Sequence, residues 1–152
     1  MSIRQVVRIV LAVTIVGLVG ASDASAGGKS CTIRGNNTGE VLAGTENADR
    51  ICARGGDDVV HGLGGDDVVR AGKGSDVAEG DSGNDRLLGG AGSDTLEGNR
   101  GRDTVRGGRG NDTVDVADGA AHDRAVGGPG NDTCIANKAD RVRGCESVDV
   151  VG

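Results

Sequence analysis

Apolar positions recur every nine residues along most of the chain, and each stands in a short run whose flanking residues are often polar. The recurring positions are Ile51, Val60, Val69, Ala78, Leu87, Leu96, Val105 and Val114. In a three-residue β-strand, the middle side chain points to one face and its two neighbours point to the other, so an apolar residue between two polar ones indicates a short strand with one buried face. The period therefore predicts a series of very short strands separated by turns.

Asp stands in each predicted turn at the same spacing. The positions are Asp49, Asp58, Asp67, Asp76, Asp85, Asp94, Asp103 and Asp112. A Gly stands two residues before each Asp from Asp58 onward, at Gly56, Gly65, Gly74, Gly83, Gly92, Gly101 and Gly110. Asn47 takes this place before Asp49. We expect it to adopt a left-handed backbone, because Asn tolerates that conformation better than any residue except Gly. A fixed period of this kind indicates a stacked repeat architecture.

The period fades at both ends of this tract. Asp112 and Asp123 are eleven residues apart, which indicates an insertion of two residues around 116–122. The register recovers in residues 127–134, which include Asp132. Before the tract, residues 35–43 form a degenerate unit in which Glu40 takes the place of Asp.

Composition restricts the fold further. The 152 residues include 30 Gly and one Pro, and none is aromatic. A conventional mixed core is not expected without large aromatic side chains. Stacking platforms for single-stranded nucleic acid are excluded for the same reason, and one Pro cannot support a collagen helix. Disorder or a Gly-dependent repeat fold remains.

The repeating unit is G-G-x-G-x-D-x-U-x, where U is apolar, and residues 89–97 and 107–115 match it in full. It resembles the RTX, or haemolysin-type, calcium-binding repeat family over residues 44–135. The resemblance implies an all-β fold, a right-handed parallel β-roll (β-solenoid) in which two units make one coil. Its two sheets would lie back to back, with small aliphatic side chains between them.

The resemblance also implies a calcium site between consecutive loops. One edge would stack Asp49, Asp67, Asp85 and Asp103, and the other Asp58, Asp76, Asp94 and Asp112. Carboxylates stacked at about 4.8 Å repel one another unless cations lie between them, and calcium takes six to eight oxygen ligands. We expect the ligands to be these Asp side chains with Asp132, and the loop backbone at Gly56, Gly65, Gly74, Gly83, Gly92, Gly101 and Gly110.

Four loops on each edge enclose three gaps, which predicts about six Ca²⁺ ions. The alternative is that these Asp residues only cap turns. Asp57 and Asp66 also lie in turns, and we expect them to be solvated.

Because a Gly-rich chain loses much backbone entropy on ordering, the calcium-free chain is expected to be largely disordered and to fold on binding.

The N-terminus predicts export. Arg4 and Arg8 precede an apolar run over residues 9–20, and Ala24-Ser25-Ala26 forms a small-residue cleavage site, as in a secretory signal peptide. An N-terminal anchor is the alternative. We therefore expect a secreted protein with a signal peptide (1–26), an N-terminal cap with the degenerate repeat (27–43), the roll (44–135) and a C-terminal cap (136–152).

Four Cys fall two at each end of the tract, and an even count in an exported chain implies disulfides. In the rod that the resemblance implies, the pairing compatible with distant ends is Cys31–Cys52 and Cys134–Cys145. A zinc site is the alternative reading of these residues.

The net charge of −6 argues against a nucleic-acid partner and suits cations. One sheet is expected to show Arg50, Arg70, Arg86 and Arg106 outward, and the other His61, Glu79, Glu97 and Asp115. These faces are either solvated or used in self-association. His61 and His122 are expected to be isolated and exposed. The Thr residues at 95, 104, 113 and 133 are not expected to form a long row on one face.

No nucleophile with a base and an orienting group is evident, so no enzymatic activity is expected. Calcium would be a structural ion. The functions that remain are calcium-dependent structure or buffering, a calcium-dependent adhesion or interaction module at the cell surface, and, least favoured, a small hydrolase. No membrane span is expected in the mature chain.

Overall fold

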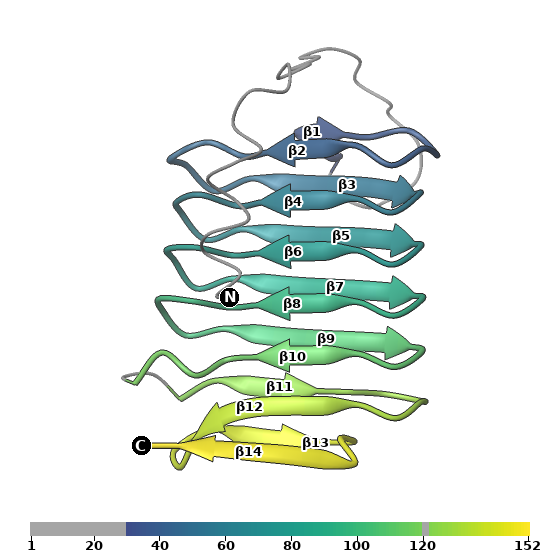
Figure 1. The fold of residues 1–152 in the computed structure, drawn as a ribbon. Coiled ribbons are helices and arrows are strands. Elements are labelled where there is room, and N and C mark those ends of the chain that lie inside the picture. The colour runs from purple at the N-terminus through teal and green to yellow at the C-terminus, as the bar shows by residue number, and fades with distance from the viewer. Residues whose placement is uncertain (1–29, 120–121) are drawn as a thin grey trace.

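A computed structural model describes residues 30–119 and 122–152, and it shows an all-strand parallel β-solenoid over these residues (Figure 1). The signal peptide predicted for residues 1–26 lies outside the described part. Sheet A contains β1 (Ile33–Arg34), β3 (Arg50–Gly55), β5 (Val68–Lys73), β7 (Arg86–Ala91), β9 (Thr104–Arg109), β11 (Arg124–Val126) and β13 (Arg141–Arg143). Sheet B contains β2 (Val41–Ala43), β4 (Val59–His61), β6 (Val77–Glu79), β8 (Thr95–Glu97), β10 (Thr113–Asp115), β12 (Thr133–Asn137) and β14 (Ser147–Val151). Within the described ranges, no helix is long and apolar enough to cross a membrane.

The chain passes from one sheet to the other with every nonapeptide, so two units form one coil, as predicted. Val60 pairs with Ala78 and Ala78 with Leu96, a constant step of two units. After β9 the step is two residues longer, as the pairing of Val105 with Ala125 shows. The predicted insertion is confirmed, and it lies in the loop between β10 and β11.

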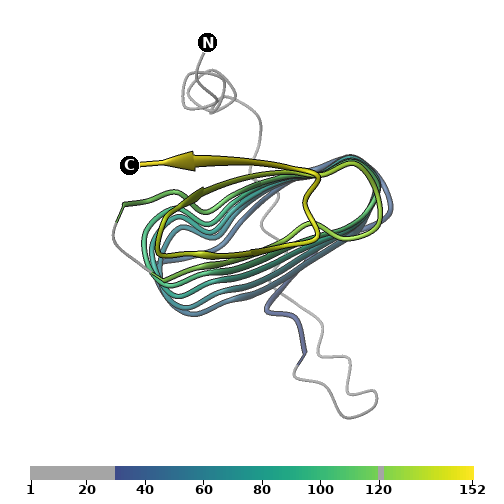
Figure 2. The same ribbon diagram turned by 90° about the horizontal axis from the view of Figure 1, so that it is seen from below.

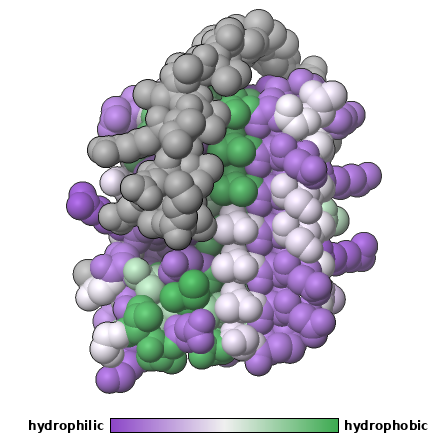
Figure 3. Space-filling model, in the orientation of Figure 1, coloured by the Kyte–Doolittle hydropathy of each residue, from purple (hydrophilic) through white to green (hydrophobic). Residues whose placement is uncertain are grey.

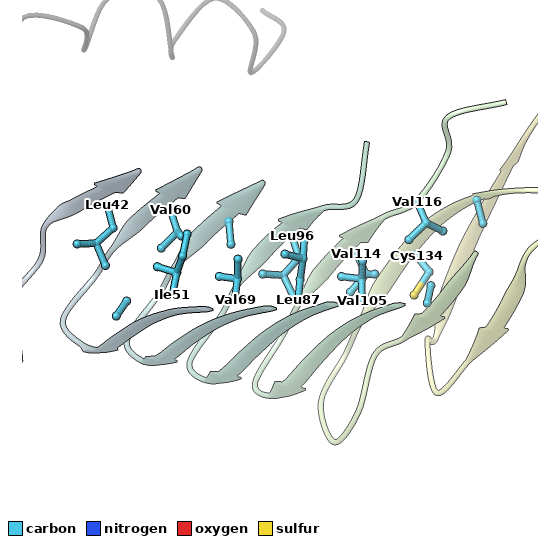
Figure 4. Close-up of a cluster of buried hydrophobic side chains, with 14 residues drawn as sticks. Leu42, Ile51, Val60, Val69, Leu87, Leu96, Val105, Val114, Val116 and Cys134 are labelled. Carbon is cyan, nitrogen blue, oxygen red and sulfur yellow. The ribbon is translucent and has the colours of Figure 1, made fainter. Parts of the chain in front are cut away.

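The core is the narrow space between the sheets, and it contains the periodic apolar residues (Figure 4). All eight recurring positions from Ile51 to Val114 are fully buried. Viewed along the solenoid axis, successive coils lie one behind the next with a small offset (Figure 2). The register places each apolar residue beside its equivalent in the next coil, as for Val60 and Ala78. Facing sheets lie only about 10 Å apart, a space that Val, Leu, Ile and Ala fill without aromatic side chains.

The two sheets differ in strand length, which the sequence did not predict. The repeat strands β3, β5, β7 and β9 have six residues, whereas β4, β6, β8 and β10 have the expected three. The longer strands continue into the next unit, where Gly72 pairs with Gly90 and Gly90 with Gly108. The strands of sheet A are longer because their Gly-rich segments also pair with those of the neighbouring coils.

Both predicted disulfides are present, one near each end of the solenoid. Cys52 lies on the outer face of β3, so the first disulfide ties the segment before β1 to the sheet surface. Cys134 lies in the core of β12 with no exposed surface, and Cys145 packs against that core. The second disulfide therefore closes the end of the core itself.

Charge is segregated between the two sheets. Every strand of sheet A contains Arg, and none contains Asp or Glu. The strands of sheet B contain Glu79, Glu97, Asp115 and Asp149 and no Lys or Arg. The predicted separation into a basic and an acidic face holds along the described length of the solenoid.

One column on the outer face of sheet B changes character along the axis. It runs through Val41, Val59 and Val77 and then through Thr95, Thr113 and Thr133, and the change is visible as green followed by white in Figure 3. No long row of Thr forms, as expected, but three of the four Thr residues do stand in this column. Thr104 lies in sheet A because its unit belongs to the alternate half of each coil.

Candidate metal centre: two ladders of buried aspartates

Each periodic Asp ends a Gly-rich turn and directly precedes a strand, and its side chain turns into the molecule. The exposed fraction is 8% for Asp49 and at most 2% for Asp58, Asp67, Asp76, Asp85, Asp94, Asp103 and Asp112. Carboxylates are seldom buried without a charged or hydrogen-bonding partner. The stacked turns are therefore the chemically unusual part of the molecule.

The buried Asp residues form two ladders, one on each edge of the solenoid. The A ladder precedes the strands of sheet A and contains Asp49, Asp67, Asp85 and Asp103; the B ladder precedes those of sheet B and contains Asp58, Asp76, Asp94 and Asp112. In both, the Oδ1 atom of each Asp after the first accepts a hydrogen bond from the backbone N–H of the Asp one coil earlier, at 2.7–3.0 Å. The two expected stacks are confirmed as spatial arrangements.

Both ladders extend beyond the regular tract. The N–H of Asp103 bonds to Asp123, and that of Asp123 bonds to Asp140. The B ladder continues from Asp112 to Asp132 and ends on Glu146 Oε2. Asp123 was missed as a candidate site residue because the insertion shifts it out of the period, although counting the inserted residues restores its register.

Except in Asp49, whose Oδ2 accepts hydrogen bonds from the N–H and the hydroxyl of Thr45, the second carboxylate oxygen has no hydrogen-bond partner along the two ladders. Among the described residues, the Oδ2 atoms that are buried and unpartnered belong to Asp58, Asp67, Asp76, Asp85, Asp94, Asp103, Asp112, Asp123 and Asp132. A buried polar atom without a partner costs about 1–3 kcal/mol, and more when it is charged. Such a series on two edges is an arrangement that a bound cation would satisfy.

Glycines at the start of each unit keep the space around these oxygens open. A Cβ atom at Gly80 would lie 2.5 Å from Asp85 Oδ2 and 2.8 Å from the carbonyl oxygen of Gly98. At Gly62 the same contacts, to Asp67 Oδ2 and the Gly80 carbonyl, are both 2.6 Å. A carboxylate and a carbonyl of neighbouring coils therefore converge on a space that any side chain would fill, and this role of the first Gly of the unit was missed.

The Gly two residues before each Asp has a different role. Gly56, Gly65, Gly74, Gly83, Gly92, Gly101 and Gly110 all have positive φ. At Gly83 a Cβ would collide with the carbonyl oxygen of Gly65 in the coil before. Asn47 does not have positive φ, so that expectation was wrong.

The non-Gly residues that do have positive φ are Arg54, Leu63, Asp81 and Asn99. Each stands four residues before a ladder Asp, where the full motif has its second Gly. In these units the position of the second Gly therefore also requires a left-handed backbone, although another residue stands there.

Burial dominates the electrostatics of the ladders. It raises the pKa of the carboxyl to about 7 in Asp85 and to about 6 in Asp58, Asp67, Asp94 and Asp103. Each N–H donor from the neighbouring coil lowers the pKa, while the neighbouring carboxylates raise it further. Burial also raises the pKa of Asp76, Asp112 and Asp123.

One minor expectation is confirmed with an addition, and one needs correction. Asp57 and Asp66 are exposed, but Asp57 Oδ1 accepts the N–H of Ser75 at 2.8 Å and Asp66 Oδ1 accepts that of Asn84 at 2.8 Å. They support a second, outer line of contacts between coils. His61 is half-buried and contacts Glu79, so it is neither isolated nor exposed, whereas His122 is exposed.

The donor set of the ladders contains only oxygen, from carboxylates and backbone carbonyls. Hard cations with flexible coordination, above all Ca²⁺, use this chemistry, and six to eight such ligands at 2.3–2.6 Å are usual for calcium. The residues present therefore fit calcium, which would supply positive charge to the unpartnered Oδ2 atoms.

Comparison with protein families finds one match. A family model described as RTX calcium-binding nonapeptide repeat (4 copies) matches residues 34–69, 43–78, 61–96, 79–114 and 115–142. Together the matches span the stacked turns of both ladders. In comparisons with curated proteins and with solved structures, nothing matches the chain.

Proposed function

Because the chain belongs to the RTX calcium-binding nonapeptide repeat family, we propose that it is a secreted calcium-binding repeat protein that folds when calcium fills its ladders. The observation that carries the proposal is the series of buried, unpartnered Oδ2 atoms. The function is structural and non-enzymatic: the ions join one coil to the next.

The proposed ligands are the Asp side chains of both ladders, with backbone carbonyls of the intervening Gly-rich loops. Asp49 to Asp103 and Asp58 to Asp112 enclose three gaps each, which gives about six ions. Asp123 and Asp132 lengthen the two ladders by one carboxylate each. Isothermal titration calorimetry that found only one or two ions per chain would contradict this assignment.

Folding on binding follows from the energetics of the ladders. Without a cation, ionised carboxylates would be buried close to one another, and the small aliphatic core offers limited compensation. The unfolded chain keeps the same carboxylates in water. Calcium that binds only the folded chain stabilises it by mass action, so the folded fraction should follow calcium concentration.

The direct test is far-UV circular dichroism of the purified chain during a calcium titration. We expect a disordered spectrum in chelator, a cooperative gain of sheet signal with calcium, and little response to magnesium, which demands a stricter octahedral geometry. A spectrum that does not change in chelator would rule out folding on binding. Calcium binding itself would still be tested by the calorimetry.

Secretion rests on the N-terminal pattern of Arg4, Arg8, the apolar run and Ala24-Ser25-Ala26. Mass spectrometry of protein recovered from the culture medium should show a chain that starts at residue 27. Retention of residues 1–26 on a membrane-associated chain would favour the anchor instead.

A second candidate function is a calcium-dependent adhesion or interaction module at the cell surface. The segregation of charge favours it, because sheet A offers exposed Arg70, Arg86, Arg106 and Arg124 on a flat face without acidic residues in its strands. Arg forms bidentate contacts with carboxylate and sulfate-like groups. Such a face fits an anionic polysaccharide, or the acidic face of another copy.

This candidate is tested by retention on an immobilised anionic polysaccharide in calcium. Replacing Arg70 and Arg106 by Ala should weaken retention, whereas Lys138→Ala, at an exposed site outside the strands, should not. Equal retention of both variants would reject the basic face as the binding surface. Salt-sensitive sedimentation of the unmodified chain would identify self-association instead.

A further inference from the structure

A histidine and two carboxylates meet at the outer side of sheet B. His61 ends β4 and Glu79 ends β6, and the two residues are direct partners in the parallel pairing of these strands. Asp81 follows β6 by two residues, at the start of the next loop. The sheet register fixes the first two side chains side by side, and the turn brings the third to them.

The ligand atoms are close enough to share one ion. His61 Nδ1 lies 3.3 Å from Glu79 Oε2, close to the separation of about 3.3 Å between two ligands on a tetrahedral metal with bonds of about 2.0–2.1 Å. One ligand atom from each of His61, Glu79 and Asp81 lies within 4.8 Å of the other two. The group therefore offers an ion one imidazole nitrogen and two carboxylates.

The third ligand is held in place by the backbone of the neighbouring coil. Asp81 Oδ2 accepts the N–H of Leu63 at 3.2 Å, which leaves its other oxygen for an ion. Hydrogen bonds of this kind orient ligands in metal sites. The side chains are half-buried rather than freely solvated, so less conformational freedom is lost when an ion binds.

Asp81 also adopts a backbone conformation that an Asp seldom adopts. Its φ is +69°, and the equivalent positions Gly72, Gly90 and Gly108 of the alternate units are Gly with positive φ. A non-Gly residue in this region costs about 1–2 kcal/mol. Arg54, Leu63 and Asn99 have positive φ at the same place in their own units, so the conformation belongs to the repeat, and here it brings the Asp81 carboxylate beside His61 and Glu79.

We propose that His61, Glu79 and Asp81 bind one transition-metal ion of the Zn²⁺ class, separate from the calcium ladders. The donor chemistry separates the two kinds of site. Imidazole nitrogen with carboxylate oxygen is a usual ligand set for Zn²⁺, whereas Ca²⁺ takes oxygen ligands. Three protein ligands leave a fourth position for water.

The test is a Zn²⁺ titration of the intact chain in saturating calcium, so that the fold is present throughout. We expect one Zn²⁺ per chain that excess calcium does not displace. His61→Gln should lower the Zn²⁺ affinity at least about tenfold, in line with the effect of losing even an outer-sphere partner. His122→Gln, at the other His of the chain, is the matched control and should retain the affinity.

Asp81→Gly separates the ligand from the fold. Gly suits the positive φ at this position, so the variant should keep the calcium-loaded circular dichroism spectrum and still lose Zn²⁺ affinity. Histidine NMR supplies an independent readout, because His61 should shift on addition of Zn²⁺ and His122 should not. Unchanged affinity in His61→Gln and Asp81→Gly, or equal shifts of both His signals, would overturn the proposal.

Discussion

At the scale of the residue, each ladder Asp has two separate tasks. Its Oδ1 atom joins two coils through a backbone N–H, as Asp85 does with Asp67 at 2.8 Å. From Asp58 onward, its Oδ2 atom stays buried without a partner. Asn retains the first acceptor and lacks the second charge, so an Asp-to-Asn substitution removes the proposed cation ligand without breaking the contact between coils.

We predict that Asp85→Asn lowers the number of bound Ca²⁺ ions and weakens the calcium-loaded fold. A site at about 100 times its dissociation constant contributes about 2.7 kcal/mol, so each lost site should lower the free energy of unfolding by roughly this amount. Calorimetry and denaturant unfolding measure the two effects. Asp57→Asn, at an exposed Asp that also accepts an N–H, is the control, and equal losses in both variants would contradict a special role for the ladder.

Gly83 and Gly119 allow the effect of positive φ to be separated from that of close stacking. Both have positive φ, but a Cβ at Gly83 would collide with the Gly65 carbonyl, while a Cβ at Gly119 would meet nothing within 4 Å. Gly119→Ala should cost about 1–2 kcal/mol, the expense of a left-handed Ala. Gly83→Ala should cost more or prevent folding, as measured by urea unfolding in calcium. Equal losses would show that coil contact at Gly83 is unimportant.

At the scale of the element, no strand is stable alone, because each strand of two to six residues finds its partners only in the neighbouring coils. Stacked repeats gain stability from interfaces between neighbours, and their ends need protection. The two disulfides join the terminal coils, but they do so in different surroundings. Cys52 lies on an outer face, whereas Cys134 is part of the core.

We predict that removal of either disulfide lowers the free energy of unfolding in calcium by about 3 kcal/mol, the chain-entropy value for loops of this order. The Cys134→Ala, Cys145→Ala pair should cost more than the Cys31→Ala, Cys52→Ala pair, although it closes the shorter loop of 11 against 21 residues. The reason is the loss of core contacts around Cys134. A larger loss at the N-terminal pair, in denaturant unfolding, would show that loop length dominates.

At the scale of the whole molecule, the ladders couple folding to pH and to calcium in opposite directions. The pKa of Asp85 is raised to about 7, and that of Asp58 and Asp67 to about 6, above the value near 3.9 of an unfolded Asp. A raised pKa means that the folded chain favours the protonated form. This stabilisation is complete below about pH 4 and is lost as the pH rises through 6 to 7.

We therefore predict that the calcium-free chain gains sheet structure when the pH falls from about 7.5 to 5 in chelator, as measured by circular dichroism. In calcium the opposite trend is expected, because protons compete with the ion for the same carboxylates. The two pH profiles should approach each other near pH 5. Profiles that run parallel would contradict the assignment of both effects to the buried ladders.

The sequence alone determined the repeat and the buried apolar series, whereas the two ladders and the Cys pairing followed from the resemblance to a known repeat family. It could do so because a solenoid places equivalent residues in register, so a period of nine maps directly onto neighbours in space. Even the insertion before Asp123 can be counted in the sequence, and Asp123 was missed as a site residue only because the period was applied without that count.

The tertiary structure decided what depends on contact between coils. Which Gly leaves room for a carboxylate, as Gly80 does for Asp85, depends on the neighbouring chain. The longer strands of sheet A depend on pairing of Gly-rich segments across coils. The meeting of His61 with Glu79 and Asp81 arises because residues in different units share a face after stacking, and a single unit contains no signal for it.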